Sequence, residues 1–460
     1  MQEFEKIKKY CDDVCEQIRW EKAKPVIAVE IENHLCDQRD AYISNGDDEV
    51  LATEKAITQM GDAVFVGQEL DKSYKPKSQW LMIILTGIFM LIGLSINYFI
   101  DNSVNSLNTF SILPYVLSFM LLIICYYIDF TELGKNAKEV YFLVLAISLL
   151  KVMFGKRIVR YIGKFSLELS YLSLLFPLAF ALLVYSMRNK GNRGILMSGI
   201  CYLPFAVILL YVPTISGFGL YTITALVVLS FAISRGWFGK NKKQGLLLVL
   251  IPTAVAFFST VIFILVKAPH RLAILFNPYN DRLGAGYIHA LIRDILSGSI
   301  LFGKGTVPQN IITALPFIGE DYFLVYLIHQ FGFIVLFCIT AFILMFFAVG
   351  IYRTLKLKSM LGSLVSLSII LTFILQCVFY IGDTLGYGIF SSYSLPFISY
   401  GKSAFFINSI LIGFMLSIFR TGEIFRDRSV ATIEKRVDQN HSLFSYDNGK
   451  IIINLKRNLY

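Results

Sequence analysis

The carboxylate of Asp321 is a candidate for acid–base chemistry in this 460-residue chain. It stands at the end of a predicted loop of about 55 residues, 267–321, and directly before an apolar run. A carboxylate in such a position can accept a proton from a substrate hydroxyl group and so act as a general base. An acid that opens a helix also stabilises the helix dipole by about 0.3–1 kcal/mol, so a purely structural role stays open here.

A cluster of basic residues forms a second candidate group. It lies between two apolar runs and consists of Lys156, Arg157, Arg160 and Lys164. The distribution of Lys and Arg over the other loops assigns this segment to the outer side of a membrane. Cations are otherwise rare on that side. Two explanations stay open for the cluster: it binds an anionic group, or it anchors the chain at lipid headgroups.

The segment 394–403, with the sequence SLPFISYGKS, combines polar, aromatic, glycine and proline residues at the start of the last apolar run. Irregular backbone at membrane depth is tolerated only where it is buried in protein or lines a wet cavity. The segment therefore predicts either a binding site or a packing joint.

The elements that must position these groups are membrane-spanning helices. The chain is 56% hydrophobic and 16% charged, whereas a soluble domain has about 25% charged residues. Its apolar residues form blocks of roughly 17–25, the length that crosses ~30 Å of hydrocarbon. We expect an all-α polytopic membrane protein with about ten spans, of which the third and sixth are short and the eighth is long enough to be tilted, kinked or projecting. The predicted spans are 79–100, 111–130, 140–154, 167–187, 194–212, 220–234, 246–266, 322–351, 361–381 and 398–419.

The distribution of the +10 formal charge predicts the orientation. Lys and Arg occur in the loops that follow the second, fourth, sixth and eighth spans, whereas three of the opposite loops, 101–110, 213–219 and 382–395, contain none. The positive-inside rule then places both termini in the cytoplasm and the long loop 267–321, between helices 7 and 8, outside.

The two ends of the chain are predicted to be cytoplasmic segments. Residues 1–75 carry apolar residues at helical spacing, which predicts a bundle of about three helices, and part of this segment resembles the prefix domain of some bacterial permeases. We expect this domain to be an interaction module without a metal site, because His34 and Cys36 alone are too few ligands. Residues 76–420 form the membrane domain, and residues 421–460 form a tail with one short strand at 450–455. No cysteine lies in an outer loop, so no disulfide framework is expected.

Several motifs of the membrane domain occur together. The long loop contains RLAILFNP from Arg271, GAGY from Gly284, LFGKG from Leu301 and LPFIGEDYF from Leu315, and the last span begins with PFISYGKS from Pro396. Over about residues 80–420 the chain resembles the SEDS family of bacterial shape, elongation, division and sporulation proteins (RodA, FtsW and SpoVE). The last motif matches the family signature PFISYGGS at seven of eight positions.

The resemblance implies a peptidoglycan glycosyltransferase that polymerises lipid II while the undecaprenyl tail stays in the membrane. Asp321 then corresponds to the essential acid of the family. A pyrophosphate leaves without a proton, so one general base is enough, whereas glycoside hydrolases usually need two carboxylates. A divalent cation such as Mg or Mn, or Lys and Arg side chains, would balance the leaving phosphates. The expected substrate-binding residues are Arg271, Lys304, Arg157, Arg160, Lys164, Ser399, Lys402 and Ser403.

The resemblance also implies partners and a location. We expect the protein in the bacterial cytoplasmic membrane, with lipid II as substrate, a class B penicillin-binding transpeptidase as partner and no nucleic acid.

The chain departs from the family at several charged positions. Glu168, Leu169, Ser170, Tyr171 and Leu174 stand where the family has Gln, Pro, Ser, Glu and Lys. The paired acids of helix eight are His329 and Gln330, Asp383 is an additional acid, and Lys402 replaces a glycine. Ionisable groups at a membrane span are functional candidates by default. Asp383 and Lys402 could pair with each other, or each could extend separately to the membrane interface.

Two other functions stay open. The lost Glu and Lys and the added N-terminal domain fit a non-catalytic scaffold or a lipid II sensor. The predicted spans and His329 within them fit a transporter of lipids or small molecules.

Overall fold

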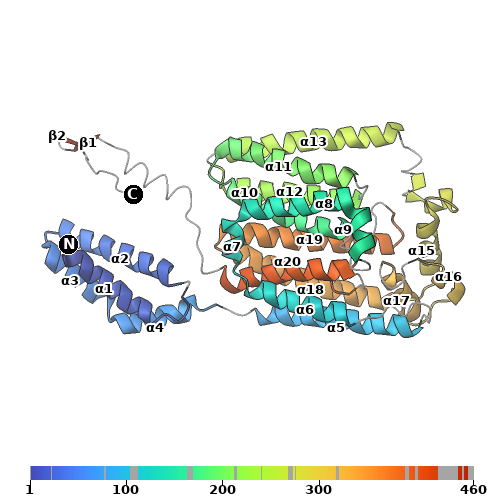
Figure 1. The fold of residues 1–460 in the computed structure, drawn as a ribbon, viewed down its shortest axis with the longest axis horizontal. Helices are drawn as coiled ribbons and strands as arrows, with labels where there is room; N and C mark the ends of the chain where they lie inside the picture. Colours follow the sequence, from blue (N-terminus) through green and yellow to red (C-terminus); the bar gives the residue numbers. More distant parts are fainter. Residues whose placement is uncertain are drawn as a thin grey trace. The chain divides into compact units, whose positions relative to one another are not determined.

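Figure 1 shows the chain as a computed structural model. The structure describes residues 2–21, 23–76, 79–103, 112–162, 169–211, 215–239, 241–267, 273–274, 276–316, 321–388, 393–398, 402–422, 444–447 and 450–453. Residue contacts divide the chain into two compact units, Met1–Ser78 and Gln79–Tyr460, and each is described by itself.

The described part of the first unit contains four helices instead of the three predicted: α1 (Gln2–Glu16), α2 (Lys24–Ser44), α3 (Glu49–Met60) and α4 (Ala63–Tyr74). The additional helix arises because Gly61 takes a left-handed φ of 95°, and the Asp62 side chain then accepts a hydrogen bond from the Phe65 N–H. Such an acceptor satisfies one of the free N–H groups at a helix start. The apolar core includes Ile7, Val14 and Leu35.

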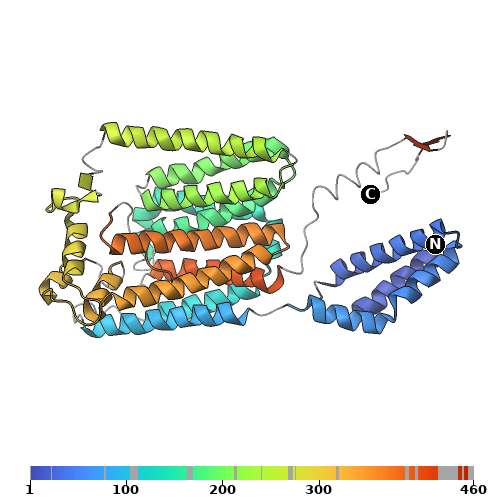
Figure 2. The same ribbon diagram turned by 180° about the vertical axis from the view of Figure 1, so that it is seen from behind.

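The second unit is a bundle of long apolar helices (Figures 1 and 2). Seven helical stretches of the described residues are long and apolar enough to cross a membrane, and two shorter apolar helices accompany them. The chain is therefore a multi-pass membrane protein, while ten spans and the side of the termini stay predictions. The helices of the bundle include α5 (Trp80–Ser103), α6 (Leu113–Tyr127), α8 (Ala137–Ile162), α10 (Phe176–Ser186), α11 (Gly191–Tyr211), α12 (Ile215–Ser234), α13 (Lys242–Lys267), α18 (Ile334–Lys356), α19 (Met360–Thr384) and α20 (Lys402–Thr421).

The centre of the bundle is formed by α10 and α19. Every residue of α10 from Phe176 to Tyr185 is buried, and most of α19 is buried as well. Helix α13 is mostly exposed and lies at the periphery. A helix that is apolar all round is buried in protein or faces lipid, so polar side chains on the central α19 need partners within the bundle.

Short helices cover one end of the bundle. We call the segment with η3 (Pro278–Asp281), α15 (Tyr287–Ser297), α16 (Gln309–Thr313) and α17 (Phe323–Phe331) the loop cap, and its side of the bundle the loop end. Figure 2 shows the cap beyond the ends of the long helices. The opposite end carries α7 (Phe130–Lys135) and the turns that join α10 to α11, α12 to α13 and α18 to α19; we call it the basic end.

The long eighth span is broken into α17 and α18. Gly332 ends α17 with a left-handed φ of 91°. The N–H groups of Phe333 and Ile334 then donate to the Ile300 and Leu301 carbonyls, at 3.1 and 3.2 Å. A side chain at position 332 would collide with the Leu301 backbone. Glycine is therefore required for both the conformation and the close approach.

This break agrees with the expectation of a tilted, kinked or projecting eighth span, whereas the predictions of a short third and a short sixth span were wrong. Helix α8 continues to Ile162, so Lys156, Arg157 and Arg160 belong to its last turns rather than to a loop. Long basic side chains allow a helix to leave the hydrocarbon without ending. Helix α12 has 20 residues and is not short.

The C-terminal tail contains the antiparallel pair β1 (Phe444–Asp447) and β2 (Lys450–Ile453), where one strand was predicted.

Candidate functional site

Asp321 lies half-buried at the loop end, two residues before the first residue of α17. Helix α19 holds the start of α17 in place: the Tyr380 hydroxyl accepts a hydrogen bond from the Leu324 N–H at 3.4 Å. The rings of Tyr380 and Phe323 stack with centroids 5.6 Å apart. Asp321 and Asp383 are both close enough to act electrostatically on the Tyr380 hydroxyl. The candidate base is thus positioned by α17 and the loop-end half of α19.

A second polar contact joins α19 to the loop cap. The Asp383 side chain is only 2% exposed, and its Oδ1 lies 2.9 Å from His289 Nε2 on α15. A buried carboxylate is costly unless it is paired or hydrogen-bonded. His289 is therefore the partner that the structure gives to the additional acid. Neither alternative for Asp383, a pair with Lys402 or separate extension to the membrane interface, anticipated this contact, which links residues 94 positions apart. The Lys402 side chain lies outside the described residues.

Arg293, one turn after His289, strengthens the same junction. Its Nε donates to the Gly386 carbonyl at 3.1 Å, and its Nη2 donates to the Phe276 carbonyl at 3.3 Å. The guanidinium group also lies over the Tyr387 ring, 5.4 Å from its centroid. Helix α15 is therefore fixed to the end of α19 by two side chains on one helical face.

Lys304 is not brought to Asp321. It lies near His329 at the other end of α17, roughly 12 Å along the axis at ~1.5 Å per residue. There the buried His329 Nε2 lies 3.1 Å from the Val307 carbonyl, and the Gly305 N–H donates to the His329 carbonyl at 2.7 Å. His329 thus fastens the loop to α17, a structural role that its place in an apolar run did not reveal.

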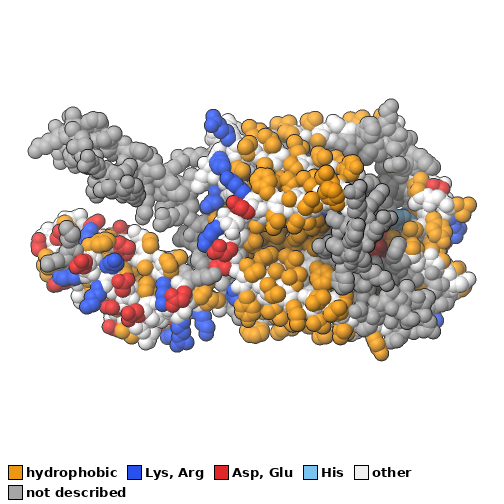
Figure 3. Space-filling view, viewed as in Figure 1, with side chains coloured by type: hydrophobic (Ala, Val, Ile, Leu, Met, Phe, Trp, Pro, Cys, Tyr) orange, Lys and Arg blue, Asp and Glu red, His pale blue; other side chains and the backbone are white. Residues whose placement is uncertain are grey.

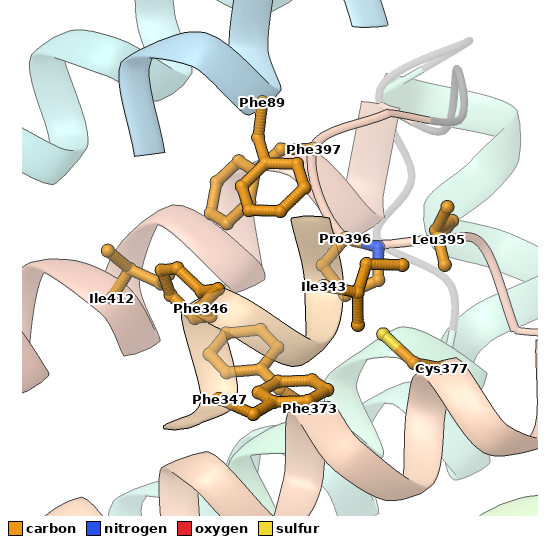
Figure 4. Close-up of a pocket in the computed structure, with 10 residues that line it drawn as sticks. All are labelled: Phe89, Ile343, Phe346, Phe347, Phe373, Cys377, Leu395, Pro396, Phe397 and Ile412. Atoms are coloured by element: carbon orange, nitrogen blue, oxygen red, sulfur yellow. The ribbon is translucent and has the colours of Figure 1, made fainter. Parts of the chain in front are cut away.

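The described part of the segment 394–403 forms a packing joint. Gln376 of α19 donates to the Ser394 carbonyl at 2.7 Å. Phe397 has a left-handed φ of 63°, which is uncommon for a residue with a side chain. Figure 4 shows Pro396 and Phe397 around an apolar cavity of about 20 Å³, together with Phe89 and Cys377. The alternative of a polar binding site finds no support in residues 394–398.

The other predicted binding residues fall largely outside the described residues. Ser403 is half-buried in the first turn of α20. The side chains of Arg157 and Arg160, and the whole of Lys164, Arg271 and Ser399, lie outside the described residues.

The loop cap contains a cavity of about 550 Å³ that sequence reasoning missed. Its wall includes Tyr287, Asn310 and the pair Arg282–Asp294, whose Nη2 and Oδ2 lie 2.6 Å apart. Burial and the hydrogen bond to Asp294 raise the pKa of Tyr279, which stands beside this pair.

Among the described residues, no three His, Cys, Asp or Glu side chains gather closely enough to hold a metal ion.

Comparison with known proteins identifies the family. The family of the cell cycle proteins FtsW, RodA and SpoVE matches residues 75–423, which is most of the chain. The chain belongs to this family. The resemblance inferred from the motifs is thereby confirmed.

Members of the FtsW/RodA/SpoVE family resemble the chain at modest identity. The probable peptidoglycan glycosyltransferase FtsW of Buchnera aphidicola is 26% identical over 369 residues, which cover 75% of this chain and 94% of that protein. The stage V sporulation protein E of Bacillus subtilis is 26% identical over 273 residues, 56% of this chain and 70% of that protein.

A solved structure shares the fold. A chain from a peptidoglycan synthase complex that coordinates polymerization and crosslinking superposes with a TM-score of 0.58 at 19% identity, and the match covers 76% of this chain and 99% of that chain. At this identity the likeness shows the fold alone.

One departure from the FtsW/RodA/SpoVE pattern is visible in the structure. Leu174, which replaces the expected Lys, is fully buried in the apolar core. The adjacent Ser173 hydroxyl lies 3.1 Å from the Tyr393 hydroxyl, just before the packing joint. At this position a buried leucine side chain stands where the resemblance implies a lysine.

Proposed function

We propose that the protein is a peptidoglycan glycosyltransferase that polymerises lipid II, with Asp321 as the general base. The observation that carries the proposal is the placement of Asp321: it is half-buried, at the loop end, and next to a helix start that Tyr380 holds. The relatives described as probable peptidoglycan glycosyltransferases support the reaction class.

The Asp321 carboxylate has one task in the proposed reaction. Asp321 accepts the proton of the acceptor hydroxyl while that oxygen forms a bond to the anomeric carbon of the donor sugar. The bond between the anomeric carbon and the pyrophosphate oxygen breaks, and the pyrophosphate leaves with the bonding electrons and needs no proton. Attack from the face opposite the leaving group inverts the anomeric carbon. Half-burial leaves one side of Asp321 open to the acceptor.

The proposal extends to location and partners. The enzyme resides in the bacterial cytoplasmic membrane with both termini in the cytoplasm, so the loop cap meets lipid II on the outer face. A class B penicillin-binding transpeptidase is the proposed partner, since the structural relative belongs to a complex that coordinates polymerization with crosslinking. Lys and Arg side chains balance the charge of the leaving phosphates, and a divalent cation, when bound, would supply the same neutralisation.

The test compares Asp321→Asn with the control Asp281→Asn, an acid of the same loop that is also half-buried. Both full-length variants are purified and supplied with lipid II, and glycan polymer is measured on gels. We expect a loss of at least ~100-fold for Asp321→Asn, the low end for removing a general base, and less than twofold for the control. Polymer at the wild-type rate from a folded Asp321→Asn variant would refute the proposal.

The burial of Leu174 favours a second candidate, a non-catalytic scaffold for cell-wall synthesis. If a Lys at position 174 is needed to balance the negative charge of Asp321, the protein keeps the fold and its partner contacts but does not polymerise lipid II at an appreciable rate. The discriminating measurement is growth of cells that depend on this protein. Full complementation by Asp321→Asn supports the scaffold, and loss of complementation supports the enzyme.

A further inference from the structure

A recessed cavity at the basic end stands apart from the site described above. It has a volume of about 200 Å³, many times the ~10–15 Å³ that one water molecule needs. It lies between the first turn of α11 and the turn that joins α12 to α13. Polar or charged residues on its wall are Asn192, Asn241 and Lys242, and apolar residues are Ile195, Ile233 and Phe238.

The backbone builds this cavity from two turns. The Asn189 N–H donates to the Trp237 carbonyl at 3.0 Å and so joins the turn before α11 to the turn before α13. Gly191 and Gly239 have left-handed φ values of 57° and 125°. A side chain at Gly245 would press on Ile195 and Ile233. The cavity is therefore a fixed feature of the fold, with an apolar floor and a polar rim.

The surroundings of the cavity carry an uncompensated positive charge. The chain has no Asp or Glu from residue 169 to residue 280. In the part of the chain that the structure describes, no ion pair to a carboxylate is seen for the basic residues of these two turns: Arg188, Lys190, Arg193, Arg235, Lys242 and Lys243. Elsewhere at the basic end, Lys135 Nζ lies 2.7 Å from Glu132 Oε1. The positive charges at this corner can therefore be balanced by an anion from outside the chain.

Aromatic residues at this corner are of the kind that is common at the level of lipid headgroups. Trp237 packs edge-on against Phe231 with ring centroids 5.8 Å apart, and tryptophan is enriched at membrane interfaces. The Arg188 guanidinium lies 3.8 Å from the Tyr185 ring centroid. Figure 3 shows Lys and Arg side chains gathered where the apolar surface of the bundle ends.

We propose that this cavity binds the phosphate of an anionic phospholipid headgroup. Lys242 supplies the charge within the cavity, and Asn192 and Asn241 supply hydrogen-bond donors. The first N–H groups of α11 and α13 lack partners within their helices and add further donors for an anion. The apolar floor suits the glycerol and first acyl carbons of a lipid, which a soluble phosphate lacks. Basic pockets between membrane helices bind anionic headgroups in the same way.

A topology signal is the competing explanation for these cations, but it requires no cavity. The two explanations differ in whether the position of a charge matters. A specific site depends on Lys242, whereas a topology signal treats all cations of the basic end alike. Lys356 provides the matched control, because it also lies at the basic end, exposed and outside the cavity. Neither residue belongs to the site of the proposed glycosyltransferase.

The experiment measures lipids retained by the full-length protein. Wild type and variants are reconstituted in nanodiscs of phosphatidylcholine with one tenth phosphatidylglycerol, released, and analysed by native mass spectrometry. We expect retained phosphatidylglycerol to fall about fivefold in Lys242→Gln, since one basic residue near an anionic surface contributes ~1 kcal/mol. Asn192→Trp, which fills the mouth without changing the charge, should lower retention as much. Lys356→Gln should retain wild-type levels.

Each outcome decides the matter. Equal losses in Lys242→Gln and Lys356→Gln, or full retention in Asn192→Trp, would overturn the site in favour of a diffuse charge effect. Displacement of the lipid by millimolar inorganic phosphate would assign the cavity to a soluble anion instead. Unchanged thermal unfolding of the variants in detergent excludes misfolding as the cause of any loss.

Discussion

The two halves of α19 use their polar side chains in opposite ways. Toward the basic end, the hydroxyls of Ser363, Ser366 and Thr372 donate to carbonyls of α19 or of its N-cap, at 2.8, 2.6 and 2.8 Å. Toward the loop end, Gln376 and Asp383 bind other segments, at Ser394 and His289. Burial is similar in both halves, so burial alone does not reveal a site. The difference lies in whether a polar group satisfies its own helix or positions another element.

The comparison predicts the largest effect at Asp383. Asp383→Ala removes the partner of His289 and loosens α15; hydrogen bonds to charged groups contribute about 1.5–3 kcal/mol. We expect faster proteolysis within the loop cap and a polymerisation rate about tenfold lower. Asp383→Asn, which keeps an oxygen acceptor for His289, should lose less.

A double-mutant cycle tests the same contact directly. If His289 is the partner, adding His289→Ala to Asp383→Ala should change the rate little further, whereas Lys402→Gln should act independently of Asp383→Ala. Additive effects for the His289 pair would contradict the contact.

The next effect is expected at Gln376. Gln376→Leu leaves the buried Ser394 carbonyl without this donor, which costs about 1–3 kcal/mol. We expect a lower thermal unfolding temperature for the protein in detergent, because the segment that contains Phe397 loses its hydrogen bond to α19. An unchanged unfolding temperature would show that the joint is held by apolar packing alone.

Tyr380→Phe should have a smaller and more local effect. The substitution keeps the stacking on Phe323 but removes the acceptor of the Leu324 N–H, a loss of about 0.5–1.5 kcal/mol. We expect the unfolding temperature to stay near wild type while the polymerisation rate falls several-fold, because the start of α17 carries Asp321. Equal losses of stability and rate would speak against a positioning role.

Ser366→Ala should have the smallest effect, a loss of stability below ~0.5 kcal/mol. The Gly362 carbonyl that accepts the Ser366 hydroxyl is also the helical acceptor of the Ser366 backbone N–H, so it keeps a partner in the variant. Stability and rate are measured as for Gln376→Leu. A loss as large as that of Gln376→Leu would remove the distinction between the two halves.

Much of the bundle could be predicted from the sequence, because long apolar runs have few alternatives to membrane helices. The length of the eighth span indicated a tilt, a kink or a projection, but the position of the break could not be predicted. Glycine inside an apolar run is common in membrane helices, and only the left-handed φ and the approach of the Leu301 backbone require it at Gly332. Asp321 was singled out by the motif around it, and its role as the base stays a prediction. The contact between His289 and Asp383 was not, because no local pattern connects residues 94 positions apart.

The break at Gly332 also has a mechanical consequence. Because the backbone N–H groups of Phe333 and Ile334 donate to the Ile300 and Leu301 carbonyls, the joint between α17 and α18 is hydrogen-bonded to the segment between α15 and α16. A force on the segment between α15 and α16 therefore reaches Asp321 through the nine residues of α17, without having to deform the helices that cross the membrane. A protein that docks on the cap could adjust the geometry of the candidate base while the bundle stays still.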